Sequence, residues 1–148
     1  MTLSMIKIFL ILLLLTILLD LPTSKSCFLT RKYYVHVINK LPSNSSNLKI
    51  HCAAGDDERG NHYLAANQEF DWSFCQGFAW TTLYFCHFWW NSKDKVFDVY
   101  NDPVHCVNDG KLSKLTTQCA WVVKSDGFYL GTYIGPGKVE DMYRYAQW

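Results

Sequence analysis

Six cysteines restrict this chain more than any other feature, because all of them follow an N-terminal apolar run. The run, IFLILLLLTIL at 8–18, follows a single lysine and is shorter than the ~20 residues of a comfortable membrane span. It has the length of the apolar part of a secretory signal peptide. In an oxidising compartment, an even number of cysteines predicts three disulfides rather than free thiols. The cysteines are Cys27, Cys52, Cys75, Cys86, Cys106 and Cys119.

The signal peptide is expected to comprise residues 1–26. Ser24 and Ser26 place small side chains at the two positions that a signal peptidase reads. An uncleaved membrane anchor is the alternative, and Asp20 and Pro22 count against it. No later run could span a bilayer, so we expect a secreted, extracellular protein.

The charge of the mature chain argues against two classes of partner. Removing Lys7, Lys25 and Asp20 from 14 basic and 13 acidic residues leaves 12 of each. A chain with no net charge and no basic stripe lacks the usual means of collecting phosphates. We therefore expect neither nucleic acid nor an anionic membrane as a partner.

Short runs of strand type, separated by turn clusters, fill the mature chain. FDWSFC at 70–75 alternates, with Phe70, Trp72 and Phe74 directed inward. No convincing helix is found. We expect an all-β fold over residues 27–134, a small antiparallel β-sandwich of seven or eight strands stapled by disulfides. The clearest strands are at 33–39, 48–52, 70–75, 81–90, 96–100, 118–124 and 127–134.

The segment after Gly135-Pro136-Gly137 departs from this pattern. VEDMYRYAQW places apolar residues at helical spacing, but so short a segment is marginal as a free helix. We expect residues 135–148 to be a frayed C-terminal tail.

A histidine adjoins a cysteine at three places, which raises the question of a metal site. Successive side chains of a strand point to opposite faces, so Cys86 and His87 cannot both bind one metal in a regular strand. No CxxC or HxxxH unit occurs, although structural zinc sites usually contain one. We expect no metal and no other cofactor. The three pairs are His51-Cys52, Cys86-His87 and His105-Cys106.

The disulfide pairing is less constrained than the number of disulfides. Both faces of TTLYFCHFWW at 81–90 are apolar, which predicts a central strand buried on each side. Its cysteine is then placed for an inter-sheet disulfide packed against aromatic rings. Six cysteines permit many pairings. Cys75 points outward and suits the N-terminal Cys27. For the others we favour Cys52–Cys119 and Cys86–Cys106.

Other candidates for chemistry are weak. In GDDERG at 55–60, three consecutive acids followed by Arg59 do not match the ligand spacing of a calcium loop, so we expect a solvated turn. No G-x-S-x-G elbow occurs, and five dispersed histidines identify no acid–base pair. We expect no enzymatic activity. Asn44 begins an N-glycosylation sequon in a polar loop.

Seven short motifs follow one another from about Val35 to Leu130. They are HVINKL, LKIHC, DDERG, FDWSF, TTLYFCHFW, FDVY and CAWVVKSDGFY. In this order and spacing they resemble the plant self-incompatibility S1 family, the S-protein homologues. The resemblance implies a small secreted β-sandwich without enzymatic activity. It also implies two disulfides among Cys52, Cys86, Cys106 and Cys119, with Cys27 and Cys75 as an additional pair.

The resemblance further implies the role of an extracellular ligand. Family members with a known role are made by the pistil and read by a receptor on incompatible pollen. We expect a secreted cysteine-rich signalling ligand for a plant cell-surface receptor, whose loops 54–62, 91–95 and 101–117 carry recognition. The alternative is a secreted defence protein that acts on microbes or binds wall polysaccharide. In the third loop the expected contact residues are His105, Asn108, Asp109, Lys111 and Lys114.

Overall fold

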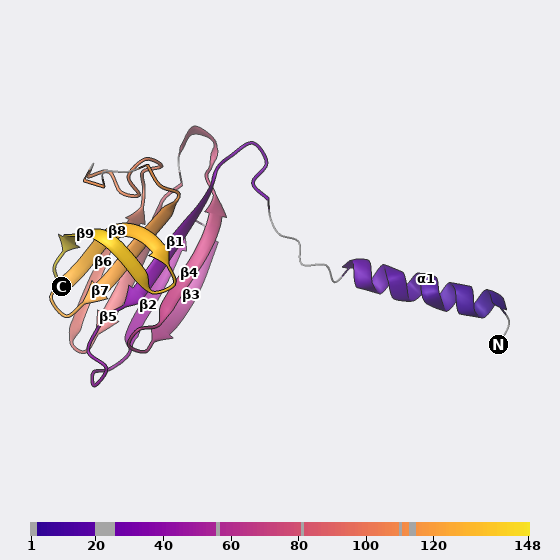
Figure 1. Ribbon diagram of the computed structural model, residues 1–148, viewed down its shortest axis with the longest axis horizontal. Coiled ribbons are helices and arrows are strands. Elements are labelled where there is room, and N and C mark those ends of the chain that lie inside the picture. Colours follow the sequence, from indigo (N-terminus) through magenta and orange to yellow (C-terminus); the bar gives the residue numbers. More distant parts are fainter. Residues whose placement is uncertain (1–2, 20–25, 56, 81, 110, 113–114) are drawn as a thin grey trace.

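In the computed structural model the chain forms two β-sheets packed face to face (Figure 1). One sheet has the strand order β4-β1-β7-β8-β9 and the other β3-β2-β5-β6, which confirms the all-β sandwich. The structure describes residues 3–19, 26–55, 57–80, 82–109, 111–112 and 115–148. The strands are β1 (Lys32–Asn39), β2 (Leu48–Ala54), β3 (Asp57–Leu64), β4 (Glu69–Cys75), β5 (Tyr84–Trp90), β6 (Lys93–Tyr100), β7 (Gln118–Lys124), β8 (Gly127–Gly135) and β9 (Lys138–Ala146).

The described residues thus contain nine strands rather than seven or eight, and one pairing is not antiparallel. β1 lies parallel to β7, with Val35 opposite Cys119. The additional strands are β3 and β9. β3 falls where a solvated turn was expected, and it pairs with β2 across a register shift between His51 and Ala53. A charged segment can form a strand here because its neighbour supplies the ladder of hydrogen bonds.

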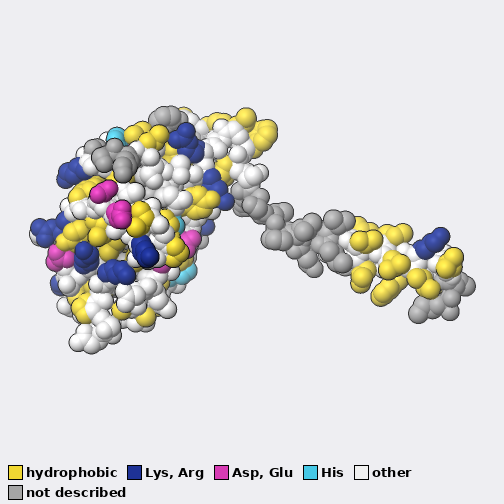
Figure 2. Space-filling model, in the orientation of Figure 1, with side chains coloured by type: hydrophobic (Ala, Val, Ile, Leu, Met, Phe, Trp, Pro, Cys, Tyr) yellow, Lys and Arg dark blue, Asp and Glu magenta, His cyan; other side chains and the backbone are white. Residues whose placement is uncertain are grey.

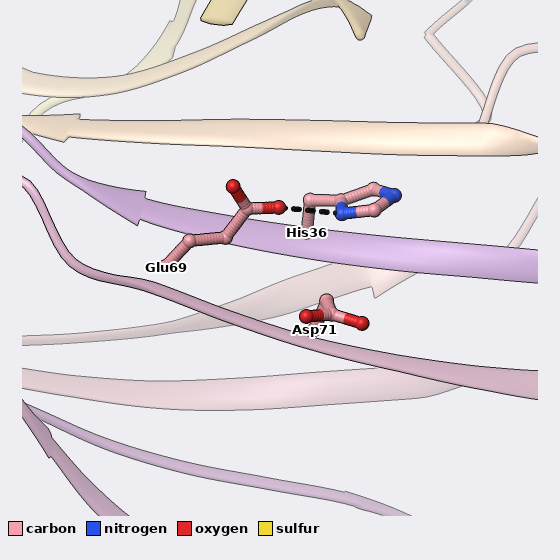
Figure 3. Close-up of side chains that lie close together, drawn as sticks. All are labelled: His36, Glu69 and Asp71. Carbon is pink, nitrogen blue, oxygen red and sulfur yellow. Dashed lines mark hydrogen bonds and ion pairs between the residues drawn. The ribbon is translucent and has the colours of Figure 1, made fainter. Parts of the chain in front are cut away.

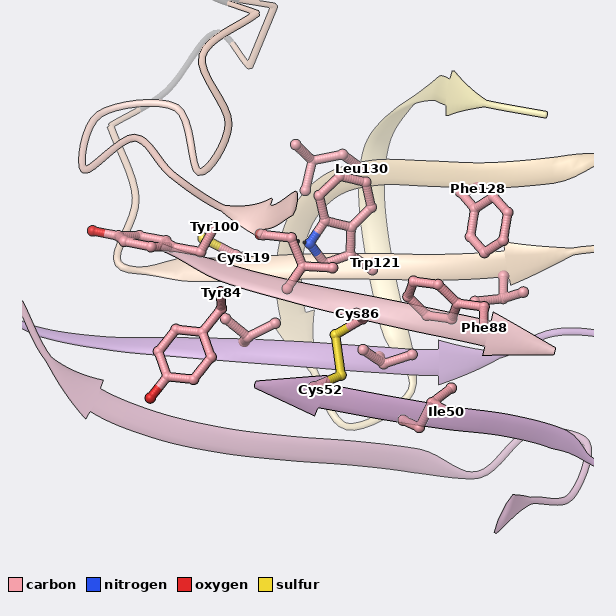
Figure 4. Packing of buried hydrophobic residues seen from close by; sticks show 14 of the residues in the cluster. Ile50, Cys52, Tyr84, Cys86, Phe88, Tyr100, Cys119, Trp121, Phe128 and Leu130 are labelled. Carbon is pink, nitrogen blue, oxygen red and sulfur yellow. Dashed lines mark hydrogen bonds between the residues drawn. A yellow bond between two sulfur atoms is a disulfide. The ribbon is translucent and has the colours of Figure 1, made fainter. Parts of the chain in front are cut away.

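The core between the sheets is built from large aromatic rings (Figure 4). Trp121 on β7 is fully buried, and its Nε1 donates to the Val99 carbonyl of the other sheet at 3.0 Å. The Phe97 ring lies 5.0 Å from that of Trp121 and 4.9 Å from that of Phe128. Aromatic pairs of this kind contribute about 0.5–1.5 kcal/mol each beyond their area burial.

β5 is central in its sheet, but only one of its faces is buried. Tyr84 and Phe88 point into the core, whereas Phe85, His87 and Trp89 lie on the outer face, half-buried or exposed. The expectation of burial on both faces is wrong because no further layer covers the outer side of this sheet within the described residues.

The disulfides differ from the favoured pairing at two of three places. Cys27 is bonded to Cys75, as expected. Cys52 is bonded to Cys86 within one sheet, and Cys106 to Cys119, so the pairs Cys52–Cys119 and Cys86–Cys106 are wrong. The reason is the strand order: β2 and β5 are neighbours, and their two cysteines face each other directly, with Cα atoms 4.1 Å apart.

The C-terminal segment is also not a frayed tail. β9 pairs with β8, and Trp148 beyond it packs on Trp90 and Phe128 with ring centroids 5.8 and 4.5 Å apart. Residues 138–148 therefore complete the five-stranded sheet and close one side of the core, so the sandwich does not end at residue 134.

The N-terminal apolar run forms helix α1 (Leu3–Leu19), which stands apart from the sandwich in Figure 1. Among the described residues, no helix combines the length and apolarity needed to cross a membrane. Cleavage after residue 26 stays a prediction, and Ser24, one of the two serines it depends on, lies outside the described residues.

Candidate functional site

One end of the sandwich gathers three segments that are far apart in the chain (Figure 1). Since β7 is parallel to β1, the loop 101–117 that precedes β7 lies at the end where β1 begins. β4 runs the opposite way, and Cys75 at its end is opposite Lys32, so residues 76–83 lie there too. We call this end, made of the described residues within 26–31, 76–83 and 101–117, the loop end.

Two disulfides hold the loop end to the sandwich. Cys27–Cys75 ties the N-terminal segment to β4, and Cys106–Cys119 ties the long loop to β7. A disulfide of this kind typically stabilises a small domain by about 2–4 kcal/mol, through an effect attributed mainly to the unfolded chain. Two of the three segments of the loop end are thus covalently joined to strands of the sandwich.

The loop 101–117 is further anchored by its own residues. Val107 and Leu112 are buried in the core. Asp109 accepts a hydrogen bond from the Tyr143 hydroxyl of β9 at 2.8 Å. Burial and this carboxylate raise the pKa of Tyr143, so the hydroxyl stays protonated and donates. Asp109 therefore holds the loop in place rather than being free for a partner.

The other expected contact residues of this loop separate into two groups. Asn108 and Lys111 are exposed, and His105 is half-buried with its Nδ1 3.7 Å from Asp102. These three are available at the surface. Lys114 lies outside the described residues.

The other two expected loops are largely strand. Most of 54–62 belongs to β3, and 91–95 is a tight turn with Lys93 already in β6. The turn between β2 and β3 lies at the loop end, because Ala53 is opposite Phe85 near the start of β5. The β5–β6 turn lies at the far end. Of the three loops expected to carry recognition, the structure therefore brings together only the loop 101–117 and the first residues of 54–62.

Large apolar side chains at the loop end are the feature that sequence reasoning missed. Phe28, Leu29, Phe78 and Leu115 are 83%, 78%, 74% and 65% exposed. Yellow side chains are visible at this end in Figure 2. Exposed apolar patches on soluble proteins mark interaction sites. The signal was the presence of such residues in CFLT and QGFAW, two segments outside the strand pattern.

A second cluster lies on the outer face of the five-stranded sheet (Figure 3). The possible ligand atoms of His36, Glu69 and Asp71 lie within 4.8 Å of one another. However, both ring nitrogens of His36 already face oxygens, Glu69 Oε1 at 2.7 Å and Gln118 Oε1 at 2.6 Å. A metal would need a free nitrogen lone pair on His36. The arrangement is therefore better explained as a hydrogen-bonded cluster of side chains than as a metal centre.

This cluster holds the end of the β8–β9 hairpin against β1 and β4. The Tyr133 ring stacks on the His36 ring with centroids 3.8 Å apart, and the Gly137 N–H donates to Glu69 Oε2 at 2.7 Å. Burial and the nearby Glu69 raise the pKa of Tyr133. The cluster therefore has a structural explanation.

The remaining histidines are each engaged separately. His51 contacts Glu58, and His87 contacts Asp94 at 3.0 Å, both on the outer face of the four-stranded sheet. His62 contacts the Arg59 carbonyl at 2.6 Å. These contacts are explained without a shared substrate or a nucleophile.

Asn44 of the sequon is exposed in the β1–β2 turn. This turn follows the end of β1, whereas the loop end lies at its start. A glycan at Asn44, which stays a prediction, would leave the loop end uncovered.

Comparison with known proteins gives one consistent result. The sequence matches the family model described as plant self-incompatibility protein S1 over residues 34–145. It is 33% identical over 94 residues to S-protein homolog 3 of Arabidopsis thaliana, which covers 63% of this chain and 59% of that protein. S-protein homolog 24 of the same plant is 37% identical over 90 residues, 58% and 53% of the two chains. The self-incompatibility protein S1 of Papaver rhoeas is 28% identical over 113 residues, 76% and 78%. The matched stretch thus spans little more than half the length of the two Arabidopsis relatives.

Proposed function

Since the chain belongs to the plant self-incompatibility protein S1 family, we propose that it is a secreted ligand read by a plant cell-surface receptor through its loop end. The observation that carries the proposal is the set of large apolar side chains exposed on loops that disulfides join to the strands of the sandwich. Rigid loops lose little conformational entropy on binding. The proposal assigns no catalytic step and does not extend to the biological response.

Within the loop end, the apolar residues supply the buried centre of the contact and the polar ones its rim. Protein interfaces are organised in this way, with most of the binding energy in a few desolvated side chains. Leu115 and Phe78 suit the centre, whereas Asn108 and Lys111 suit the rim. This differs from an interface carried by the polar loop residues alone.

The test is binding of the secreted, oxidised, fluorescently labelled protein to intact plant cells, pollen included, with unlabelled protein as competitor. Leu115→Asp should weaken saturable binding at least about tenfold, because a charge would have to be desolvated in the contact. Val96→Asp is the matched control, since Val96 is 51% exposed on the outer face of the four-stranded sheet. Equal losses in both variants, or loss only in Val96→Asp, would contradict the loop end as the receptor site.

Polysaccharide binding, as a defence protein would use, has less support. The outer face of the four-stranded sheet exposes Tyr63 and Phe85. Trp89 on the same face is covered, by His87 at 3.6 Å between ring centroids and by the Lys49 ammonium at 4.4 Å. Its ring is therefore not free to stack on a sugar. Competable binding to isolated cell walls would favour this function over a receptor ligand.

A further inference from the structure

The three disulfides differ in how deeply they are buried. Cys75 is exposed at the end of β4, and Cys27, to which it is bonded, is half-buried. The cysteines of the other two disulfides belong to the hydrophobic core, and the Cys52–Cys86 bond lies among core side chains in Figure 4. A reagent in solution can therefore reach Cys27–Cys75 far more readily than the other two bonds. The core cysteines, each at most 1% exposed, are Cys52, Cys86, Cys106 and Cys119.

The surface beside Cys75 is hollowed rather than covered. Cys75 lines two adjoining hollows, of about 420 and 470 Å³. The two hollows share Asp57, Thr82 and Tyr84 as further lining residues. Volumes of this size admit small molecules, and the rate of thiol–disulfide exchange depends on such access. The position of Cys75 therefore leaves room for the approach of a small dithiol.

The disulfide is the main connection between residues 26–30 and the sandwich. Among the described residues, 26–30 form no hydrogen bond, ion pair or ring contact with the strands, and the first such bond joins the Gln76 N–H to the Arg31 carbonyl at 3.0 Å. Phe28 and Leu29 are 83% and 78% exposed, so little of either side chain is buried. Leu29 also has a φ of 67°, an angle that non-glycine residues rarely adopt. Opening the disulfide would leave this segment with little to hold its conformation.

The rest of the loop end does not depend on this bond. β4 stays paired with β1 from Lys32–Cys75 to Ile38–Glu69, and Trp72 and Phe74 of β4 lie in the core. The loop 101–117 keeps its own disulfide to β7. Loss of the Cys27–Cys75 bond would therefore change one segment of the loop end and leave the sandwich folded.

We propose that Cys27–Cys75 is a thiol–disulfide exchange site, at which a dithiol releases residues 26–30 and thereby weakens receptor contact. A thiolate of the dithiol attacks one sulfur, and the other cysteine leaves as a thiolate that takes up a proton. The second thiol of the dithiol then displaces the remaining cysteine. The dithiol is oxidised to a disulfide, and both cysteines are reduced to thiols by two electrons in all. The effect on receptor contact rests on the proposed function, whereas the exchange itself does not.

The exchange is tested on the purified, secreted, oxidised protein without denaturant, with dithiothreitol as the dithiol. Thiols are trapped with iodoacetamide at successive times and located by peptide mass. We expect Cys27 and Cys75 to be alkylated at least about tenfold faster than the other four cysteines, while the amide NMR signals of β1 and β7 are unchanged. Alkylation of all six cysteines together, or of a core cysteine before Cys75, would overturn the proposal.

The double variant Cys27→Ser with Cys75→Ser reproduces the released state without a reductant. Its amides at 28–30 should show fast motion in NMR relaxation that the oxidised protein lacks, whereas the strands should keep their signals. Relaxation at 28–30 equal to that of the oxidised protein would show that the disulfide does not hold this segment, and would overturn the release.

Binding to plant cells tests the consequence for recognition. The double variant should bind at least about threefold more weakly than the oxidised protein, and Phe28→Ala, which keeps the disulfide, should also weaken binding. Full binding by the double variant, with binding still lost in Leu115→Asp, would overturn the control of recognition by this bond but leave the loop end as the receptor site. Full binding by Leu115→Asp as well would instead contradict the receptor site itself.

Discussion

Gly131 on β8 shows how closely the last two strands approach each other. A Cβ added there would lie 2.6 Å from the Glu140 carbonyl oxygen, 2.6 Å from Val139 Cγ1 and 2.8 Å from Met142 Cγ. These contacts are too short, so β9 would have to move. We predict that Gly131→Ala lowers the free energy of unfolding by about 1–3 kcal/mol, measured by urea denaturation.

Gly60→Ala is the control for this prediction. Nothing lies within 4 Å of the added Cβ there, although φ is +73°. It should cost about 1 kcal/mol through backbone strain alone and leave amide exchange in β9 unchanged. Gly131→Ala should speed exchange in β9. The same exchange rates in both variants would show that β9 does not depend on the close approach.

At the scale of single residues, side-chain alternation correctly predicted the buried face of β4. Trp72 and Phe74 of β4 are buried as predicted, and Cys75 is exposed. Alternation could not tell whether the second face of β5 is covered, because both of its faces are apolar. Coverage depends on a further layer elsewhere in the chain, and sequence pattern does not show one.

Among the elements, β9 makes the largest difference between expectation and structure. Tyr145 packs against Phe97 and Trp121, with ring centroids 5.4 and 5.1 Å away. We predict that truncation after Gly135 lowers the free energy of unfolding by at least about 3 kcal/mol, the usual cost of removing one large core ring. Urea denaturation of the truncated and full chains measures the difference.

The double variant Tyr145→Ala with Trp148→Ala separates ring packing from strand pairing, because it retains β9. It should lie between the full and truncated chains in stability. A truncated protein within about 0.5 kcal/mol of the full one would mean that the segment is frayed after all.

Sequence could predict the strands that alternate but not those held by their neighbours. β9 contains Glu140, Asp141 and Arg144, and β3 contains charged residues and a glycine, so neither shows a clear strand pattern in the sequence. Both are edge strands, stabilised by the sheet that they join. The Cys52–Cys86 pair depends on the same information, since it follows from β2 and β5 being neighbours.

For the whole molecule, the loop end could be predicted only in part. The position of the loop 101–117 and its cysteine were evident from the sequence. Its partners at that end were not, because the parallel pairing of β1 with β7 sets which segments meet there. Only that arrangement shows that the exposed apolar side chains of residues 26–31 and 76–83 lie at the same end of the sandwich.

The fold as a whole should lose stability in alkaline solution. Burial raises the pKa of Tyr84, Tyr100, Tyr143 and Tyr145 in the folded protein above the ordinary 10.0. Their contribution is complete below pH ~10, where folded and unfolded chains both keep the protons. Above that pH the unfolded chain releases protons that the folded chain keeps, so the free energy of unfolding falls as pH rises toward the folded pKa values.

Urea denaturation in steps from neutral pH to above pH ~10 measures this fall. Tyr143→Phe should be less stable at neutral pH, because the hydrogen bond to Asp109 is lost, but its stability should decline less steeply above pH ~10. Tyr63→Phe, which alters a ring that is 63% exposed, is the control and should follow the unmodified protein. A decline that Tyr143→Phe does not change would mean that this partly buried hydroxyl does not link the folding of β9 and the loop 101–117 to pH.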